Sequence, residues 1–372
     1  MVSNFSDFIS KKIDLDTNLM WFEKSNKYIV LNDLTEKLLL NKIDPALYPL
    51  AEDFIIENSK ISESLELIDK DLENLLLECN SDNSSEFKEK TNLNRELSAY
   101  SSNFKFNDRT VKIEYGSENL KNLIYPKFEH LNTNDKENIK FKITEKDKKI
   151  YFHIEDLFIG AWGISEMHEF QGKVSMELTS FFHNKDDSDW VSVFHGSTLC
   201  KKNNTVMLTG DSGNGKSSLS TILMYNGFSL IADDFSPLDN RGYHYNFPSA
   251  ISIKEGFYSV AKDLTNKFND LKEYYINEIK GNVKYLPANS ENKLVLSSKC
   301  NEVINVTFGR DLKNEIFEIN KGLAIQKVLP DAWISNNKEH ADLFIEWVKS
   351  SNFYNLTYND NERALDMINK IF

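Results

Sequence analysis

The residues best suited to chemistry lie in the segment GDSGNGKS, residues 210–217. It matches in full the G-x-x-x-x-G-K-[ST] pattern of phosphate-binding loops. Glycines let successive backbone N–H groups surround an anion at positions where a side chain would block its approach. A helix that begins near Lys216 would direct its positive end at the same anion. The residues expected to contact the bound phosphates are Gly210, Asp211, Ser212, Gly213, Asn214, Gly215, Lys216, Ser217 and Ser218.

The side chains of this segment suit a nucleoside triphosphate bound with a metal ion. Lys216 would supply a mobile cation for the β- and γ-phosphates, and Ser217 a hydroxyl ligand for Mg²⁺. The sequence therefore predicts ATP and Mg²⁺ as the ligands of this loop.

Two acidic residues follow the next apolar segment of the chain. Residues 228–232 (FSLIA) predict a strand, and Asp233 and Asp234 come directly after it. Carboxylates delivered beside a phosphate loop can bind the metal ion or accept the proton of an attacking hydroxyl. Because adjacent strand residues point to opposite faces, the chain must bend here if both are to serve one site. We expect one aspartate to act as the base and the other to bind the metal, and the sequence leaves the order open.

Strands and helices alternate irregularly around these residues. Apolar patterning predicts a strand before the loop, at Val206–Leu208, and a helix after it that ends near Gly227. Further strands are expected at residues 110–115, 139–143, 149–154, 190–194 and 354–358, and helices at 173–182, 321–329, 340–349 and 361–371.

The first 79 residues predict a small separate unit. Residues 18–23 and 27–31 favour a hairpin, Asp33 can cap a helix, and two more helices are expected at 47–56 and in a leucine-rich stretch ending near Cys79. Residues 80–103 are polar and rich in Ser and Asn, so they predict a linker. The predicted organisation is thus a unit at 1–79, a linker at 80–103 and a larger domain at 104–372.

Composition limits the classes of partner. The chain has 372 residues, 40% of them hydrophobic, and a formal net charge of −13, which disfavours general binding of nucleic acid. Three widely spaced cysteines predict neither a disulfide framework nor a zinc site. The N-terminal residues lack the apolar core of a signal peptide, and no apolar run is long enough for a spanning helix. We expect a cytoplasmic protein that does not bind membranes.

The loop and the aspartates together resemble the catalytic domain of HPr kinase/phosphorylase and its relatives. That family carries GDSGxGKS, a short helix ending in glycine, and a strand ending ADD; here the chain reads GDSGNGKS and then NGFSLIADD. A histidine followed by a small residue precedes the loop in the family, and FHGS at residues 194–197 matches it. Weaker landmarks are residues 247–254 and 284–287. The resemblance covers about residues 104–372.

This resemblance implies an α+β fold shared with phosphoenolpyruvate carboxykinases, in which a mixed sheet carries the phosphate loop. It implies that Lys216 binds phosphate, that Ser217 and Asp234 bind the metal, and that Asp233 and Asp234 divide the roles of base and metal ligand. His195 would lie near the aspartates and act in catalysis by tuning or bridging them. A lone histidine is otherwise more often a surface or core residue.

The chain also departs from the family. Ser218 stands where HPr kinases usually carry Glu, and the glycine- and arginine-rich segment of the true HPr kinases is missing. These departures argue against HPr as substrate and against the phosphorylase reaction. The hexameric assembly of HPr kinases is not carried over either, because the N-terminal unit is not their N-terminal domain, although a homo-oligomer stays open. Arg310 and Lys284 are candidate replacement cations, or ordinary surface charges.

The N-terminal unit resembles the PqqD-like, winged-helix-like domains that recognise leader peptides of ribosomally made, modified peptides. Residues 27–39 (KYIVLNDLTEKLL) carry the resemblance, which covers about residues 15–79. It implies docking of a peptide as an added strand on a sheet edge, near residues 20–23 or 28–31. The alternative is an unrelated unit that only adds stability.

Three functions follow from these patterns. The first is an ATP-dependent kinase acting on a Ser or Thr hydroxyl of a peptide or small protein, such as a precursor peptide held by its leader. The second is a small-molecule kinase of the same fold, and the third a non-catalytic, ATP-binding regulator or peptide carrier. A regulator has no need for Asp233 and Asp234 beside the loop. The acceptor itself is not specified by the sequence.

Overall fold

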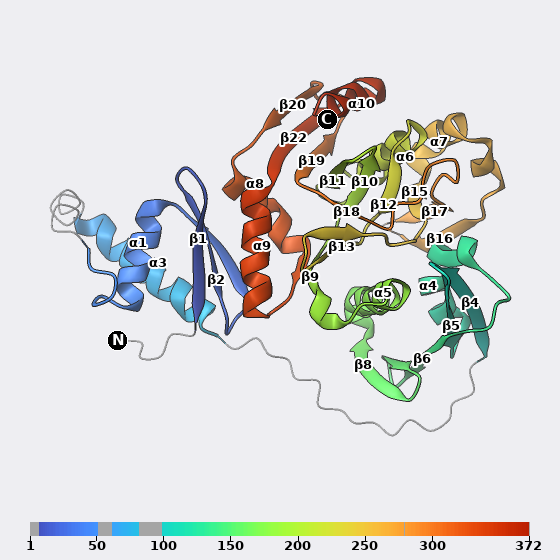
Figure 1. Cartoon of the computed structure of the whole chain (residues 1–372), viewed down its shortest axis with the longest axis horizontal. Coiled ribbons are helices and arrows are strands. Elements are labelled where there is room, and N and C mark those ends of the chain that lie inside the picture. The colour runs from blue at the N-terminus through green and yellow to red at the C-terminus, as the bar shows by residue number, and fades with distance from the viewer. Residues whose placement is uncertain (1–6, 51–61, 82–98, 279, 372) are drawn as a thin grey trace.

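The computed structural model of the protein describes residues 7–50, 62–81, 99–278 and 280–371 (Figure 1). Helices and strands are intermixed along the chain, and its sheets contain both parallel and antiparallel pairs. The predicted mixture of α and β structure is confirmed. Within the described residues, no helix is both long and apolar enough to cross a bilayer.

The N-terminal unit is a three-stranded antiparallel sheet with helices on one face. The strands lie in the order β1-β2-β3, so β2 is central. Apolar side chains of one face, including Met20 and Phe22, pack on the helices. The predicted hairpin and the first and third helices are confirmed, whereas β1 was not predicted. The elements are β1 (Phe8–Asp14), β2 (Thr17–Phe22), β3 (Lys27–Leu31), α1 (Asp33–Ile43) and α3 (Ser62–Cys79).

Two details of this unit differ from the sequence prediction. The cap of α1 is Asn32, whose side chain accepts a hydrogen bond from the Thr35 N–H at 2.7 Å, while Asp33 is the first helical residue. Of the helix predicted at 47–56, residues 47–50 form a turn and irregular chain, and 51–56 lie outside the described residues.

The other face of the N-terminal sheet is buried against the C-terminal part of the chain. Ile13, Leu19 and Trp21 share one apolar core with residues of α8 (Lys321–Val328) and α9 (Lys338–Ser350). Figure 1 shows the sheet standing beside these two helices. The unit is thus docked on the larger domain, and its attachment is not limited to the linker that the sequence predicts.

A five-stranded mixed sheet opens the larger domain, in the order β4-β5-β6-β7-β8. Two helices, α4 (Glu118–Phe128) and α5 (Met167–His183), share its apolar core. Because β4 begins at Tyr100, the last residues of the predicted linker belong to the sheet, where Phe104 is buried. The strands are β4 (Tyr100–Phe106), β5 (Arg109–Tyr115), β6 (Ile139–Lys146), β7 (Lys149–Ile154) and β8 (Leu157–Gly163).

A six-stranded mixed sheet carries the phosphate loop. Its order is β12-β10-β11-β19-β22-β20, with β11, β19 and β22 parallel and the other pairs antiparallel. Residues of α6 (Lys216–Tyr225) and α10 (Asn361–Asn369) pack on one face, and residues of α8 and α9 on the other. The strands are β10 (Ser197–Lys201), β11 (Asn204–Thr209), β12 (Ser229–Ala232), β19 (Glu302–Phe308), β20 (Glu315–Glu318) and β22 (Asn352–Tyr358).

A second five-stranded sheet is antiparallel, in the order β18-β14-β13-β9-β21. Smaller elements, including a three-stranded sheet in the order β15-β17-β16, complete the fold. The strands of both sheets are β9 (Trp190–Phe194), β13 (Ser236–Asp239), β14 (Tyr243–Tyr245), β15 (Ile251–Lys254), β16 (Glu273–Asn277), β17 (Gly281–Leu286), β18 (Ser297–Lys299) and β21 (Ala332–Ile334), and helix α7 spans Tyr258–Leu264.

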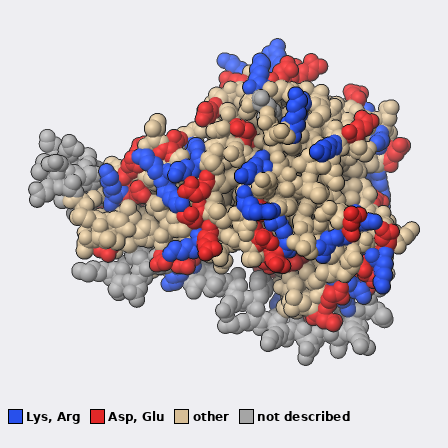
Figure 2. All heavy atoms as spheres, in the orientation of Figure 1, with Lys and Arg blue, Asp and Glu red and all other residues tan. Residues whose placement is uncertain are grey.

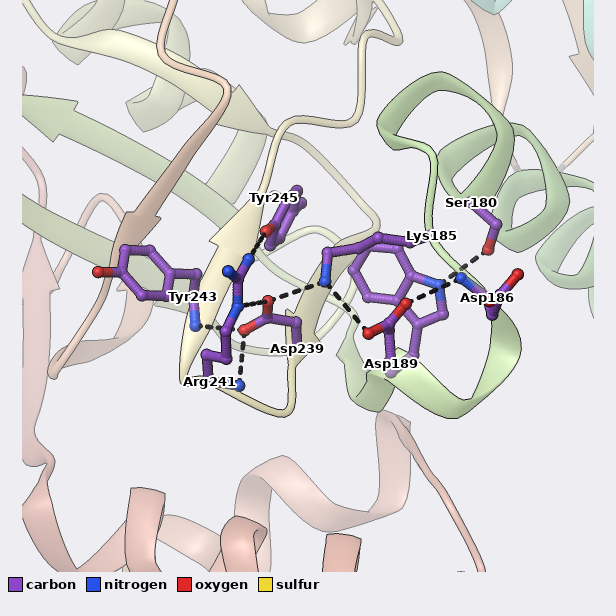
Figure 3. A network of polar contacts seen from close by, with 9 residues as sticks. Ser180, Lys185, Asp186, Asp189, Asp239, Arg241, Tyr243 and Tyr245 are labelled. Atoms are coloured by element: carbon purple, nitrogen blue, oxygen red, sulfur yellow. Dashed lines mark hydrogen bonds and ion pairs between the residues drawn. The ribbon is translucent and has the colours of Figure 1, made fainter.

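A buried ion pair fixes β13 to the end of α5. Lys185 Nζ lies 3.0 Å from the Asp239 carboxylate, which also accepts backbone N–H bonds from Arg241 and Tyr243, both at 2.9 Å (Figure 3). Burial alone would raise the pKa of Asp239, but these hydrogen bonds lower it below its usual value. Asp239 pairs with Trp190 of β9, at the ends of the two strands that lie far from His195.

Surface charge is not segregated on the face shown in Figure 2, where Lys and Arg side chains alternate with Asp and Glu over both parts of the molecule. This face has no extended basic surface of the kind that a phosphate backbone requires.

Candidate functional site

Residues 210–215 connect β11 to α6, and Lys216 and Ser217 are the first residues of that helix. Gly210, Gly213 and Gly215 have φ angles of +134°, +95° and +91°, which side-chain-bearing residues rarely adopt. A Cβ on Gly215 would lie 2.8 Å from the Tyr358 hydroxyl, so the position also lacks room for one. Gly215 caps α6 without a side-chain hydrogen bond. No side chain of the loop therefore caps the first N–H groups of the helix. An anion site needs these N–H groups as donors.

Lys216 folds back onto this loop. Its Nζ donates hydrogen bonds to the carbonyl oxygens of Gly210 and, at 3.2 Å, Asp211. The side chain is buried, and this burial lowers the pKa of Lys216 despite the nearby carboxylates of Asp234 and Asp233. The cation is thus held at the loop, within reach of an anion enclosed by it.

Ser217 and Asp233 form the first polar pair of the site. The Ser217 hydroxyl lies 3.3 Å from one carboxylate oxygen of Asp233 and 3.4 Å from the other. The Ser197 hydroxyl also donates to Asp233. Asp233 is only 2% exposed, and burial, reinforced by the charge of Asp234, raises its pKa to about 6.

His195 and Asp234 form the second pair. Nδ1 of His195 lies 3.0 Å from Oδ1 of Asp234, and Lys127 Nζ lies 3.9 Å from Oδ2. The Asp234 side chain is 44% exposed, so an external group can reach it. Desolvation would raise the pKa of Asp234, but Lys127 and His195 together hold it below its usual value. Asp234 has a φ of 66°, so the chain bends here, as two adjacent carboxylates serving one site require.

Strand pairing brings these residues together from separate parts of the sequence. Ser236 of β13 pairs with Phe194, and Ala232 of β12 pairs with Thr198 of β10. The strands before and after Asp233 and Asp234 thus pair with the strands after and before the FHGS segment, which brings that segment beside the two aspartates. Gly196 is required at this crossing, because a Cβ there would lie 2.8 Å from the carbonyl oxygen of Leu208.

The donor set fits Mg²⁺ held together with phosphate. A serine hydroxyl and a carboxylate are hard oxygen ligands, and Mg²⁺ in nucleotide sites commonly takes one or two protein ligands with phosphate oxygens and water. The described residues contain no group of three or more His, Cys, Asp or Glu side chains that could hold a metal. A cation here would thus depend on the nucleotide for further ligands.

All nine predicted loop residues lie between the end of β11 and the first turn of α6. The structure groups Lys216, Ser217, Asp233, Asp234 and His195 around this loop. The pairing of Ser217 with Asp234 at a metal stays a prediction, whereas the contact found is the one with Asp233. Neither predicted replacement cation gains support. Lys284 donates to the carbonyl oxygen of Phe268 at 3.3 Å, and Arg310 is exposed, with no ion pair to it found among the described residues.

Sequence reasoning missed two contributors. Ser197 was quoted only as the last residue of the FHGS segment, with no role, yet its hydroxyl donates a hydrogen bond to Asp233. Lys127 belongs to the last turn of α4, far from the loop in sequence, and carries no motif that could have indicated it.

Comparison with known proteins finds a distant structural similarity but no related family model. No family model matches the chain, and no curated protein matches it. Among solved structures, the chain is similar to one titled as the Hpr(Ser) kinase/phosphatase from Coxiella burnetii, with 16% sequence identity and a TM-score of 0.24. The match covers 48% of this chain and 95% of that chain, and it is a distant likeness.

Proposed function

We propose that this protein transfers the γ-phosphoryl group of ATP to a Ser or Thr hydroxyl of a peptide or small protein. The observation that carries the proposal is the placement of two carboxylates beside one phosphate loop, Asp233 against Ser217 and Asp234 against His195. A loop that only binds a nucleotide with Mg²⁺ can use the first of these pairs, but it has no need for the second.

The residues divide the work as follows. Loop amides and Lys216 hold the phosphates, and Ser217 with the buried Asp233 provides the protein ligands for Mg²⁺. When bound, Mg²⁺ neutralises charge on the β- and γ-phosphates. The exposed Asp234, oriented by His195, accepts the hydroxyl proton of the acceptor. The hydroxyl oxygen then bonds to the γ-phosphorus, the bond from that phosphorus to the β–γ bridging oxygen breaks, and ADP leaves.

The acceptor that we propose is a ribosomally made precursor peptide held through its leader by the N-terminal unit. A peptide strand can add only to an edge of a sheet. Of the two edges expected from the sequence, the one near residues 20–23 belongs to the central strand β2 and is already paired on both sides. Strand β3, at residues 27–31, is an outer strand and supports docking there.

The test is incubation of the full chain with Mg²⁺, ATP and the short peptide encoded beside its gene. Mass spectrometry should find one added phosphoryl group on a Ser or Thr, and Asp234→Asn should lose most of this product. A phosphorylated metabolite alongside unmodified peptide would instead identify a small-molecule kinase. ATP binding without turnover, unchanged by Asp233→Asn or Asp234→Asn, would identify a regulator.

A further inference from the structure

An exposed aromatic side chain lies beside the phosphate loop. Phe308 is the last residue of β19 and is 44% exposed. Its backbone N–H donates a hydrogen bond to the Asn214 carbonyl at 3.1 Å, and its Cβ lies 3.0 Å from the position that a Cβ on Gly215 would occupy. Phe308 thus contacts the loop at the two residues before α6, and nearly half of its surface stays open to a ligand.

A buried tyrosine holds this ring in place. Phe308 pairs with Tyr358 in the parallel register of β19 and β22, so the two side chains point to the same face of the sheet. Their ring centroids lie 5.2 Å apart, with an angle of 57° between the rings. Tyr358 is only 1% exposed and shares an apolar core with residues of α6. The ring of Phe308 therefore rests on a fixed support beside the start of this helix.

The strand order gives the direction in which a triphosphate lies across the loop. Asp233 and Asp234 follow β12, on one side of β11 in the order β12-β10-β11-β19-β22. Phe308 ends β19, on the other side of β11. In the proposed function the γ-phosphate lies at the aspartates. Because the three phosphates form a linear chain, the nucleoside then leaves the loop on the side of β19 and β22.

The carboxyl ends of three parallel strands meet on that side. β11, β19 and β22 run parallel, and ligands of open α/β sheets bind outside such strand ends. The last residues of these strands are Thr209, Phe308 and Tyr358. Thr209 and Tyr358 are buried, so Phe308 is the one of the three that offers apolar surface to a ligand.

Polar side chains in the segments after Phe308 and Tyr358 are bonded to one another or to the backbone. Asn314 Nδ2 donates to Asn359 Oδ1 at 2.7 Å, and Asn314 Oδ1 accepts the Asn359 N–H at 2.9 Å. Asn359 Nδ2 donates to the Leu312 carbonyl at 2.8 Å. These amides are engaged in holding the segments together, which favours a flat apolar contact with a base over readout of its edge by hydrogen bonds.

We propose that Phe308 stacks on the base of the bound nucleotide and so makes the site prefer purine over pyrimidine triphosphates. Stacking on an aromatic side chain accepts any base, because every base has a π-face. A purine has the larger ring system and covers more of Phe308 than a pyrimidine does. This inference rests on the proposed function, in which a nucleoside triphosphate is the phosphoryl donor. It adds the residue that binds the base and the class of base that is preferred.

Calorimetry on the full chain with Mg²⁺ tests the contact. The ligands are ATP, UTP and inorganic tripolyphosphate, which has the phosphates but no base. Phe308→Ala should raise the Kd for ATP about tenfold and change the Kd for tripolyphosphate less than about twofold. The wild type should bind ATP at least about threefold more tightly than UTP, and Phe308→Ala should bring this ratio close to one. The bond to Asn214 comes from the backbone, so this variant keeps it.

Two further variants separate stacking from general effects on the surface. Phe308→Trp keeps an aromatic ring and should bind ATP at least as tightly as the wild type. Phe317→Ala is the matched control, since Phe317 is 48% exposed and belongs to the same sheet. It pairs with Asn355, three residues before Tyr358, so its side chain lies on the opposite face. This variant should change none of the three Kd values.

The outcomes separate this inference from the proposed function. An unchanged Kd for ATP in Phe308→Ala, or an equal loss of ATP and tripolyphosphate affinity, would overturn the stacking contact and leave the kinase assay unaffected. Loss of ATP affinity alone would support the contact, even if no phosphopeptide forms in that assay. No binding of any of the three compounds to the wild type would overturn both the contact and the phosphate site.

Discussion

Nδ1 of His195 lies 3.0 Å from Oδ1 of Asp234, while the neighbouring Asp233 is turned toward Ser217. A regular strand would place these two side chains on opposite faces of the sheet. The left-handed backbone at Asp234 instead lets both side chains lie near the phosphate loop. Asp234 is open to an acceptor and Asp233 is not. The two aspartates therefore have different environments despite being adjacent.

Replacing Asp234 tests its role as the base. Asp234→Asn keeps the side-chain shape, and Asn tolerates the left-handed backbone, so the fold should survive. We expect kcat to fall about 10²- to 10⁴-fold with ATP affinity nearly unchanged. His195→Ala should lower kcat less, and the double variant should be no worse than Asp234→Asn alone because the two residues act as a unit. Full turnover in Asp234→Asn would exclude it as the base.

Asp233 should make the nucleotide-free protein less stable as pH rises. A carboxyl whose pKa is higher in the folded state binds more protons when folded, so stability falls as pH increases from about 4 to about 6 and is then constant. The shift from 3.8 to about 6 corresponds to a cost of about 3 kcal/mol at neutral pH.

Asp233→Asn removes this cost and also removes the proposed metal ligand. Urea unfolding at several pH values should show the variant gaining stability over the wild type between pH 4 and 6, by up to about 3 kcal/mol, while Mg²⁺-dependent turnover is lost. A stability difference that does not change with pH would contradict the assigned environment of Asp233.

Two glycines offer a matched comparison. Gly215→Ala combines a left-handed backbone with a Cβ 2.8 Å from the Tyr358 hydroxyl, so nucleotide binding should be lost, as measured by calorimetry. Gly172→Ala lies inside α5 with no atom within 4 Å of the added Cβ. That variant should gain about 0.5–1 kcal/mol of stability and bind nucleotide normally. Normal nucleotide affinity in Gly215→Ala would argue against the loop as the phosphate site.

The ion pair between Lys185 and Asp239 should be important for stability. Neither side chain is more than 9% exposed. In Asp239→Asn, the remaining ion pair of the buried cation within the described residues is with Asp189, 3.6 Å away. We expect a loss of about 3 kcal/mol in thermal or urea unfolding. Adding Lys185→Met should restore part of this loss, since the unpaired charge is then gone. An additive double variant would show that the pair is not coupled.

The local chemistry of the site could be predicted from sequence, because a phosphate loop is a contiguous motif. The strand before Gly210 and the helix from Lys216 follow from glycine positions and apolar spacing. The bend at the aspartates was only a condition for both to serve one site, and the structure has it at Asp234. Lys127 could not be found this way, since only tertiary packing brings the last turn of α4 to Asp234.

The order of the strands and the docking of the N-terminal unit on the larger domain could not be predicted from the sequence either. β1 reads FISKKID, and its two lysines obscure an alternation in which only Ile13 is fully buried. β10 was missed because Ser197 and Thr198 are polar, yet both are buried in the sheet. That β2 is central, and β3 an edge, depends on finding β1 first.

The shared core of the N-terminal sheet with α8 and α9 has a practical consequence. Cutting the chain after Cys79 would leave Phe344, Trp347 and their neighbours without part of their cover, since Trp21 and Leu19 belong to the same core. A shortened protein would thus lose solubility and activity for reasons unrelated to peptide capture. Exchanging this unit with that of another protein would for the same reason require matched substitutions on α9.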